Sequence, residues 1–155
     1  MKISNLLKEE AILPSMASRN KAEILKELSS HLVSIFKIKE TADTLFKILE
    51  SREELGSTGI GDGIAIPHGK VPSIDEELLI VGRSKDGIDF NAMDSNPVHL
   101  FFLLVGPENA ASMHLKALAK LSRILSNPTL RNKLLNAETK NEMFTLLADE
   151  DSKYS

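Results

Sequence analysis

The chain has 155 residues, of which 42% are hydrophobic and 26% charged, with a formal net charge of −3 and no cysteine. These values are typical of one globular domain with a buried core, and they exclude disulfides, cysteine-ligated zinc and a basic surface for nucleic acid. No apolar run approaches the roughly 20 residues of a membrane helix, and the N-terminus lacks a signal-peptide core, so we expect a cytoplasmic protein without membrane insertion.

Two helices are predicted in the first third of the chain. One begins at Asn20, which forms a candidate capping box with Glu23 and is followed by apolar residues at helical spacing. The other covers residues 41 to 55, where alanine, leucine and phenylalanine recur on one face. A loop with five glycines in fifteen positions, residues 56 to 70, then ends the helical pattern.

Short strands are predicted after this loop. Residues 64 to 66 form a strand candidate that Pro67 stops. A second strand is predicted over residues 77 to 84, followed by a turn at 84 to 87 and a further short strand at 88 to 90.

The last third of the chain continues with a longer strand and three helices. Residues 98 to 105 are apolar almost without a break, which is typical of a strand buried on both faces in the middle of a sheet. Helices are predicted over residues 109 to 125, 128 to 135 and 138 to 147, and the polar residues 149 to 155 are predicted to be a disordered tail. This order of elements predicts an α/β fold whose sheet is covered by helices on both faces.

The glycine-rich loop, GSTGIGDGIAIPHGK, is a candidate anion cradle, because glycines expose backbone N–H groups and adopt positive φ. It is not a Walker loop, since no Gly-Lys-Ser/Thr follows its glycines. It is not a dinucleotide fingerprint either, since GIGDG has the wrong spacing and follows a helix. The glycines alone also fit a flexible connector.

His68 gives this loop a chemical interpretation. A neutral imidazole nitrogen is a nucleophile that can attack phosphorus reversibly. Pro67 restrains the backbone before it, and Gly69 would leave room for a bulky partner. Taken alone, His68 also fits a surface histidine that merely ends a strand.

Two further side chains are candidates for the same site. His114 shares an apolar stripe with three leucines of the 109 to 125 helix, so its ring must find a hydrogen-bond partner or border a polar site. Arg52 lies at the end of the helix before the loop, where a guanidinium could hold a phosphoryl group. Both also have ordinary interpretations, as a satisfied core histidine and a surface arginine paired with a glutamate. His31 and His99 have only such an interpretation, and no histidine spacing indicates a metal site.

The segment SREELGSTGIGDGIAIPHGK resembles the active-site segment of the enzyme IIA domains of the bacterial phosphotransferase system, fructose/mannitol type, which include the nitrogen-regulatory enzyme IIA proteins. The segments DGIDFNAMDSNPVHLFFLLVGPE and HLKALAKLSRIL resemble the same family, so the likeness covers roughly residues 3 to 148. It implies a single type 2 enzyme IIA domain over residues 1 to 155. It also implies a mixed central sheet of about five strands with helices on both faces.

The resemblance assigns roles by position. It implies that His68 accepts a phosphoryl group on Nε2 from HPr or a nitrogen-branch HPr-like protein, while a backbone carbonyl holds Nδ1. His114 would be the second active-site histidine and Arg52 the arginine near the phosphohistidine, and no metal or organic cofactor is implied. We also expect an apolar rim around the site where the partner docks, with Ile64 and Met113 as candidates.

Three functions fit the sequence. The first is a freestanding regulatory phosphocarrier that acts on target proteins. The second is the soluble IIA subunit of a fructose- or mannitol-type sugar transporter, which passes phosphate to an enzyme IIB. The third is a phosphate- or nucleotide-binding module without phosphotransfer. Replacement of His68 separates them, because it abolishes phosphorylation in the first two and spares ligand binding in the third.

Overall fold

Strand β6 (Val98–Pro107) is the centre of a mixed six-stranded sheet. The structure is a computed structural model that describes residues 2 to 154. Before β6 the elements are η1 (Ile3–Asn5), η2 (Glu9–Ala11), β1 (Ile12–Leu13), α1 (Lys21–Phe36), α2 (Ala42–Glu54), β2 (Gly59–Gly61), β3 (Ile64–Ala65), β4 (His68–Val71) and β5 (Leu78–Ile88). After it come α3 (Ala111–Leu125), α4 (Pro128–Asn136) and α5 (Lys140–Ser152).

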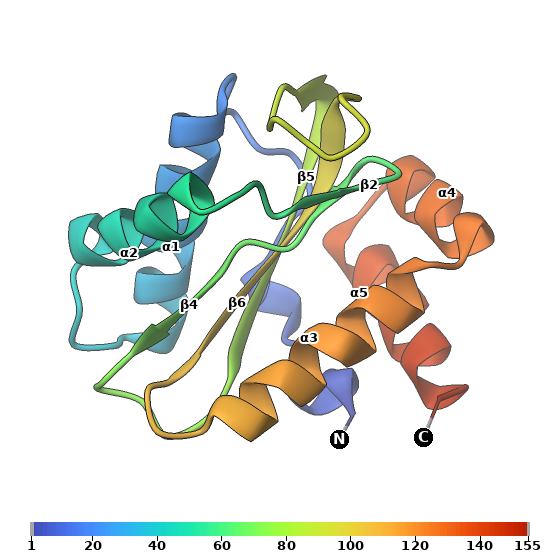
Figure 1. The fold of residues 1–155 in the computed structure, drawn as a ribbon. Helices are drawn as coiled ribbons and strands as arrows, with labels where there is room; N and C mark the ends of the chain where they lie inside the picture. The colour runs from blue at the N-terminus through green and yellow to red at the C-terminus, as the bar shows by residue number, and fades with distance from the viewer. Residues whose placement is uncertain (1, 155) are drawn as a thin grey trace.

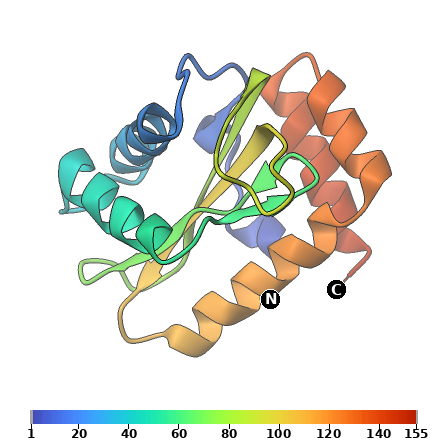
Figure 2. The same ribbon diagram turned by 45° about the horizontal axis from the view of Figure 1, so that its top comes forward.

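Helices cover both faces of this sheet, as the sequence predicts. The strand order is β1-β5-β6-β3-β2, and β4 pairs with β6 beyond β3. Helices α1 and α2 lie on one face, and α3, α4 and α5 lie on the other (Figures 1 and 2). Within the part of the chain that the structure describes, no helix has the length and apolar character to span a bilayer.

The apolar run of β6 is buried on both faces, which confirms its predicted central position. It pairs antiparallel with β5 on one edge and parallel with β3 and β4 on the other. Successive side chains alternate between the two cores. Those on the side of α3 and α5 are Leu100, Phe102 and Leu104, and those on the side of α1 and α2 are Phe101, Leu103 and Val105.

The first two helices begin at side-chain caps. The Oδ1 atom of Asn20 accepts the backbone N–H of Glu23 at 2.9 Å, and the hydroxyl of Thr41 accepts that of Thr44 at 3.1 Å. The Glu23 carboxylate accepts the N–H of Arg19 at 2.9 Å, one residue before the expected position of a capping box. Both helices therefore begin where the sequence predicts.

The predicted turn at residues 84 to 87 is wrong, because β5 continues without a break from Leu78 to Ile88. Its register with β6 shifts between Arg83 and Ile88, and Gly87 has a φ of 82°. A glycine with positive φ serves a bulge as well as a turn. Gly87 therefore marks an irregularity within one strand and not the end of a strand.

The predicted disordered tail is wrong for residues 149 to 152, since α5 continues to Ser152. The side chain of Asp151 is fully buried, and its carboxylate accepts the N–H of Ser4 at 2.9 Å. The Nζ atom of Lys120 lies 3.7 Å from the same carboxylate. The acidic residues that suggested a tail thus anchor the last helix turn, while Ser155 lies outside the described residues.

Arg83 connects three segments from inside the protein. Its side chain is 2% exposed, and its Nε donates to the carbonyl of Pro14 at 2.9 Å. One Nη1 atom donates to the carbonyls of Leu134 at 2.8 Å and Ala137 at 2.6 Å. These two carbonyls belong to the C-terminal end of α4, where no helix partner exists. The guanidinium therefore supplies donors to carbonyls that the fold buries.

Replacement of Arg83 by methionine should lower the free energy of unfolding by roughly 3 kcal/mol, because buried carbonyls lose their donors. Urea unfolding measures this loss. Arg19→Met, at an exposed arginine, should change stability by less than about 0.5 kcal/mol. Equal effects of the two substitutions would contradict this role for Arg83.

Candidate functional site

The glycine-rich loop is a β-hairpin, not a flexible connector. Strands β2 and β3 pair antiparallel, with Gly59 opposite Ala65 and Gly61 opposite Ile64. The turn between them uses positive φ at Gly61 (96°), Asp62 (58°) and Gly63 (77°). Glycines relieve the steric cost of this conformation at two of the three positions.

The start of the hairpin is fixed to the end of α2. The carboxylate of Glu53, whose side chain is 6% exposed, accepts the N–H of Thr58 at 3.1 Å and also accepts the Thr58 hydroxyl. It forms an ion pair with Lys21 at 2.9 Å. These contacts hold the hairpin next to the last turn of α2, which carries Arg52.

His68 opens strand β4, whereas the sequence left open that it ends a strand. Strands β3 and β4 pair with the same edge of β6, with Ile64 opposite Leu100 and His68 opposite Leu104. Pro67 interrupts them because it has no N–H, but its carbonyl accepts the N–H of Leu104 at 3.0 Å. The interruption presents a half-buried imidazole at the edge of a rigid sheet.

Both ring nitrogens of His68 have partners that define the tautomer. The Nδ1 atom lies 2.9 Å from the carbonyl oxygen of Ile66. Because a carbonyl can only accept, Nδ1 carries the proton. The Nε of Arg52 donates to Nε2 at 3.2 Å, so Nε2 holds the lone pair. The prediction that a backbone carbonyl holds Nδ1 is confirmed.

Arg52 is held at both ends of its guanidinium. Besides the contact with His68, its Nη1 donates to the carbonyl of Gly56 at 2.9 Å. Within the described part of the chain it forms no salt bridge with a neighbouring glutamate, so the ordinary surface interpretation does not apply. The guanidinium is thus positioned beside the nucleophilic nitrogen.

His114 lies on α3 with its ring centroid 5.8 Å from that of His68. Its Nδ1 lies 2.6 Å from a carboxylate oxygen of Glu77, and the two side chains are 5% and 1% exposed. The structure therefore brings together all three predicted site residues. The sequence analysis missed Glu77, because a glutamate before an apolar strand gives no signal of a partner 37 residues away.

The other two histidines each contact a backbone carbonyl away from Arg52, His68 and His114. The Nε2 of His31 lies 2.8 Å from the carbonyl oxygen of Glu10, and the Nδ1 of His99 lies 3.0 Å from that of Ser84. Across residues 2 to 154, no three side chains of the metal-ligating types gather in one place.

Burial of its ring lowers the pKa of His68 below the ordinary value of 6.5. The hydrogen bond to the Ile66 carbonyl opposes this shift, while the charges of Arg52 and His114 lower the pKa further. The environment therefore favours the neutral ring, which is the nucleophilic form.

Two expectations about the surroundings of His68 are wrong. A Cβ at Gly69 would lie 2.9 Å from Cγ2 of Ile48, so the glycine lets α2 pack closely on β4 and does not make room for a partner. Ile64 is 1% exposed and cannot form a rim, because β3 is covered on both sides. Met113 is 48% exposed and remains a rim candidate, together with the 66% exposed Leu115.

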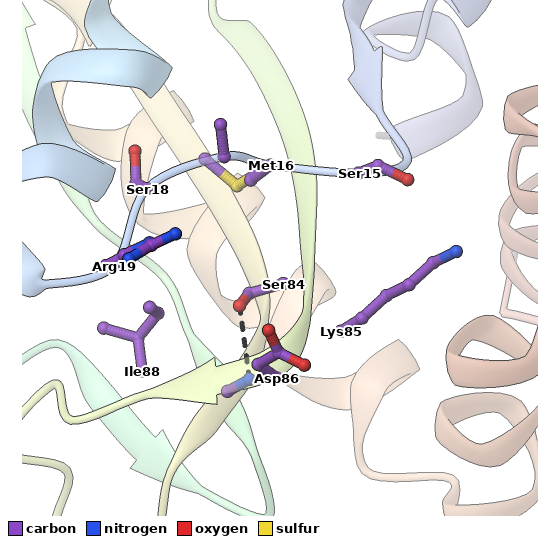
Figure 3. A pocket seen from close by; sticks show the side chains of 10 residues that line it. Ser15, Met16, Ser18, Arg19, Ser84, Lys85, Asp86 and Ile88 are labelled. Carbon is purple, nitrogen blue, oxygen red and sulfur yellow. Dashed lines mark hydrogen bonds between the residues drawn. The ribbon is translucent and has the colours of Figure 1, made fainter.

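One pocket in the described structure lies away from Arg52, His68 and His114. It encloses about 520 Å³ between residues 15 to 19 and residues 84 to 88 (Figure 3). Its walls are mostly polar, and none of Arg52, His68 and His114 lines it. Arg52 and His68 are half-buried and His114 is buried beside them, so the site is only partly exposed.

Comparisons with known proteins agree on one family. The model of "Phosphoenolpyruvate-dependent sugar phosphotransferase system, EIIA 2" matches residues 5–150. A nitrogen regulatory protein of Bradyrhizobium diazoefficiens is 38% identical, over 96% of this chain and 95% of that protein. The fructose-specific EIIABC component of Bacillus subtilis is 36% identical over 97% of this chain, which spans 24% of that protein. The crystal structure of nitrogen regulatory protein IIA-Ntr from Neisseria meningitidis has a TM-score of 0.87 and 32% identity, with coverage of 94% of this chain and 98% of that one.

We expect His68 to titrate below 6.5, and Arg52→Gln to raise its midpoint because a neighbouring positive charge is removed. Histidine ring NMR against pH measures both midpoints, with urea-unfolded protein as the reference. Since the folded pKa is lowered, the unfolded chain binds more protons near pH 6.5, so the contribution of His68 to stability falls as pH drops below that value. A midpoint at or above the unfolded one would contradict the burial argument.

Gly69→Ala should destabilise the protein by about 1 to 3 kcal/mol, because the new methyl group overlaps Ile48 and pushes α2 from β4. Ile48→Ala removes the obstructing atom, so the double variant should cost less than the sum of the two single ones. Urea unfolding of the four proteins measures this coupling. If the losses in the free energy of unfolding from Gly69→Ala and Ile48→Ala are additive, the close packing on Ile48 is not the reason for a glycine at position 69.

Proposed function

This chain belongs to the EIIA 2 family of the phosphoenolpyruvate-dependent sugar phosphotransferase system, and from that membership we propose that it is a regulatory phosphocarrier that accepts a phosphoryl group on Nε2 of His68. One observation carries the proposal. The Ile66 carbonyl holds the proton on Nδ1, which leaves the lone pair of Nε2 beside the guanidinium of Arg52.

The transfer step follows from this geometry. The lone pair of Nε2 attacks phosphorus in line as the bond to the donor's histidine nitrogen breaks, and that electron pair returns to the donor ring. The attack places positive charge on the ring of His68, which the Ile66 carbonyl stabilises through Nδ1–H. Arg52, already 3.2 Å from Nε2, shifts to the phosphoryl oxygens and balances their charge.

We assign the donor role to HPr or a nitrogen-branch HPr-like protein, and the acceptor role to an enzyme IIB or a regulated target protein. The half-buried ring of His68 and the exposed side chains of Met113 and Leu115 on α3 support docking of such a partner. The 38% identity to a nitrogen regulatory protein favours the regulatory branch. The 36% identity to a fructose-specific component supports the second candidate, a sugar-transport IIA that passes phosphate to enzyme IIB.

Incubation with phosphoenolpyruvate, enzyme I and HPr or its nitrogen-branch counterpart should add one acid-labile phosphoryl group, which intact mass detects. His68→Ala should carry none, because the nucleophile is gone, and Arg52→Gln should react on the order of 100-fold more slowly, because charge compensation is lost. His31→Ala is the matched control and should react like the wild type, since His31 binds only the Glu10 carbonyl.

Two outcomes would overturn this function. The first is a wild type that stays unmodified beside an active relay, which would favour a phosphate-binding module. The second is a His68→Ala variant that is still modified. Addition of a fructose-type enzyme IIB to the phosphorylated protein separates the branches, because rapid loss of phosphate to it favours the transport role.

A further inference from the structure

Glu77 is a buried carboxylate that the phosphocarrier role does not by itself explain. The residue is 3% exposed and directly precedes β5. One carboxylate oxygen lies 2.6 Å from Nδ1 of His114, and the other is buried without a hydrogen-bond partner among the described residues. A buried carboxylate is costly unless a positive charge compensates it. Its position therefore requires a compensating group beside it.

The sheet is built to accommodate this carboxylate. The register of Leu78 opposite Val105 places Glu77 next to Gly106 across the two central strands. A Cβ at Gly106 would overlap one carboxylate oxygen of Glu77 and lie 2.7 Å from its Cδ. Only a glycine leaves this space free. The carboxylate thus occupies space that any side chain at position 106 of β6 would fill.

The contact with Glu77 also defines the ring of His114. Because a carboxylate only accepts, Nδ1 of His114 carries a proton and Nε2 is the remaining polar atom of the ring. Nε2 is buried and has no partner among the described residues, in a ring 5.8 Å from that of His68. In both histidines, therefore, Nδ1 donates its proton to an oxygen acceptor, and Nε2 is the ring nitrogen that can interact with a phosphoryl group.

A phosphoryl group on His68 would change which protonation state of His114 is favourable. With a lone pair on Nε2, the ring of His114 would repel the phosphoryl oxygens, whereas a proton from solvent on Nε2 makes the ring a cationic donor to them. The charged groups around the two rings are Arg52 and Glu53 from α2, and Glu77, which contacts His114. Glu77 is the carboxylate in direct contact with the ring of His114, so it stabilises the cationic ring together with the phosphoryl group.

We propose that Glu77 is a positioning residue for phosphotransfer. It holds the ring of His114 through Nδ1–H and compensates the charge of the doubly protonated ring, so that Nε2–H donates to the phosphoryl group on His68. This role rests on the proposed function. It goes beyond that function by assigning the second histidine its protonation state and the residue that maintains it.

The test compares Glu77→Gln, Glu77→Leu and the control Glu76→Gln, which changes the exposed neighbour. Gln keeps an acceptor for Nδ1–H but no charge, so His114 should keep its tautomer while kcat for phosphorylation by HPr falls on the order of tenfold at unchanged KM. Leu removes the acceptor, so ring ¹⁵N NMR should show that Nδ1 of His114 loses its fixed proton. Glu76→Gln should match the wild type in each measurement.

Several results would overturn the proposal. Glu77→Gln with a wild-type kcat shows that the charge has no role, and a fall in kcat for Glu76→Gln of equal size shows that the effect is not specific to Glu77. NMR of the unphosphorylated wild type tests positioning without any donor, and an Nδ1 of His114 that lacks a proton contradicts it. A wild type that is never phosphorylated, whatever residue 77 is, marks failure of the proposed function instead, and the transfer role of Glu77 fails with it.

Discussion

The hydrogen bond between the Ile66 carbonyl and Nδ1 of His68 is the contact on which the site depends. It closes over Pro67, whose missing N–H and fixed φ interrupt the edge strand at this point. The N–H of Ile66 meanwhile binds the carbonyl of Thr58, so the residue that orients the ring is itself tied to the glycine hairpin. One backbone acceptor thereby places the proton of His68 on Nδ1 and leaves the lone pair on Nε2.

The rest of the fold fixes what surrounds that nitrogen. Strand β6 supports β4 by four register pairs, from His68 opposite Leu104 to Val71 opposite Pro107. Helix α2 packs closely on β4 at Gly69 and places Arg52 beside His68. Helix α3 places His114 in contact with Glu77. The site thus combines side chains from three parts of the chain, and their positions relative to one another are set by packed elements and not by loops. In the proposed function, preorganised charge of this kind would favour phosphoryl transfer.

Much of the fold could be predicted from the sequence, because capped amphipathic helices have a clear periodic signal and β6 is a nearly unbroken apolar run. Of the short strands, β3 lies within the predicted strand over residues 64 to 66, but β1, β2 and β4 could not be predicted, since they exist only through pairing with β5, β3 and β6. Gly87 could not be assigned from the sequence, because a glycine with positive φ is typical of both a turn and a bulge. The burial of Asp151 could not be predicted either, because a charged residue near the C-terminus is usually exposed. The role proposed for His68 follows from its sequence motif. The role proposed for Glu77 could not be predicted, because it depends on a contact with a helix distant in sequence.

The position of the phosphoryl group on the ring tests the central claim most directly. Phosphorylated, ¹⁵N-histidine-labelled protein can be examined by NMR for one-bond coupling between ³¹P and each ring nitrogen. The account predicts coupling to Nε2 of His68, with a proton retained on Nδ1. Coupling to Nδ1, or to a nitrogen of another histidine, would contradict it, because the Ile66 carbonyl would then not select the nucleophile.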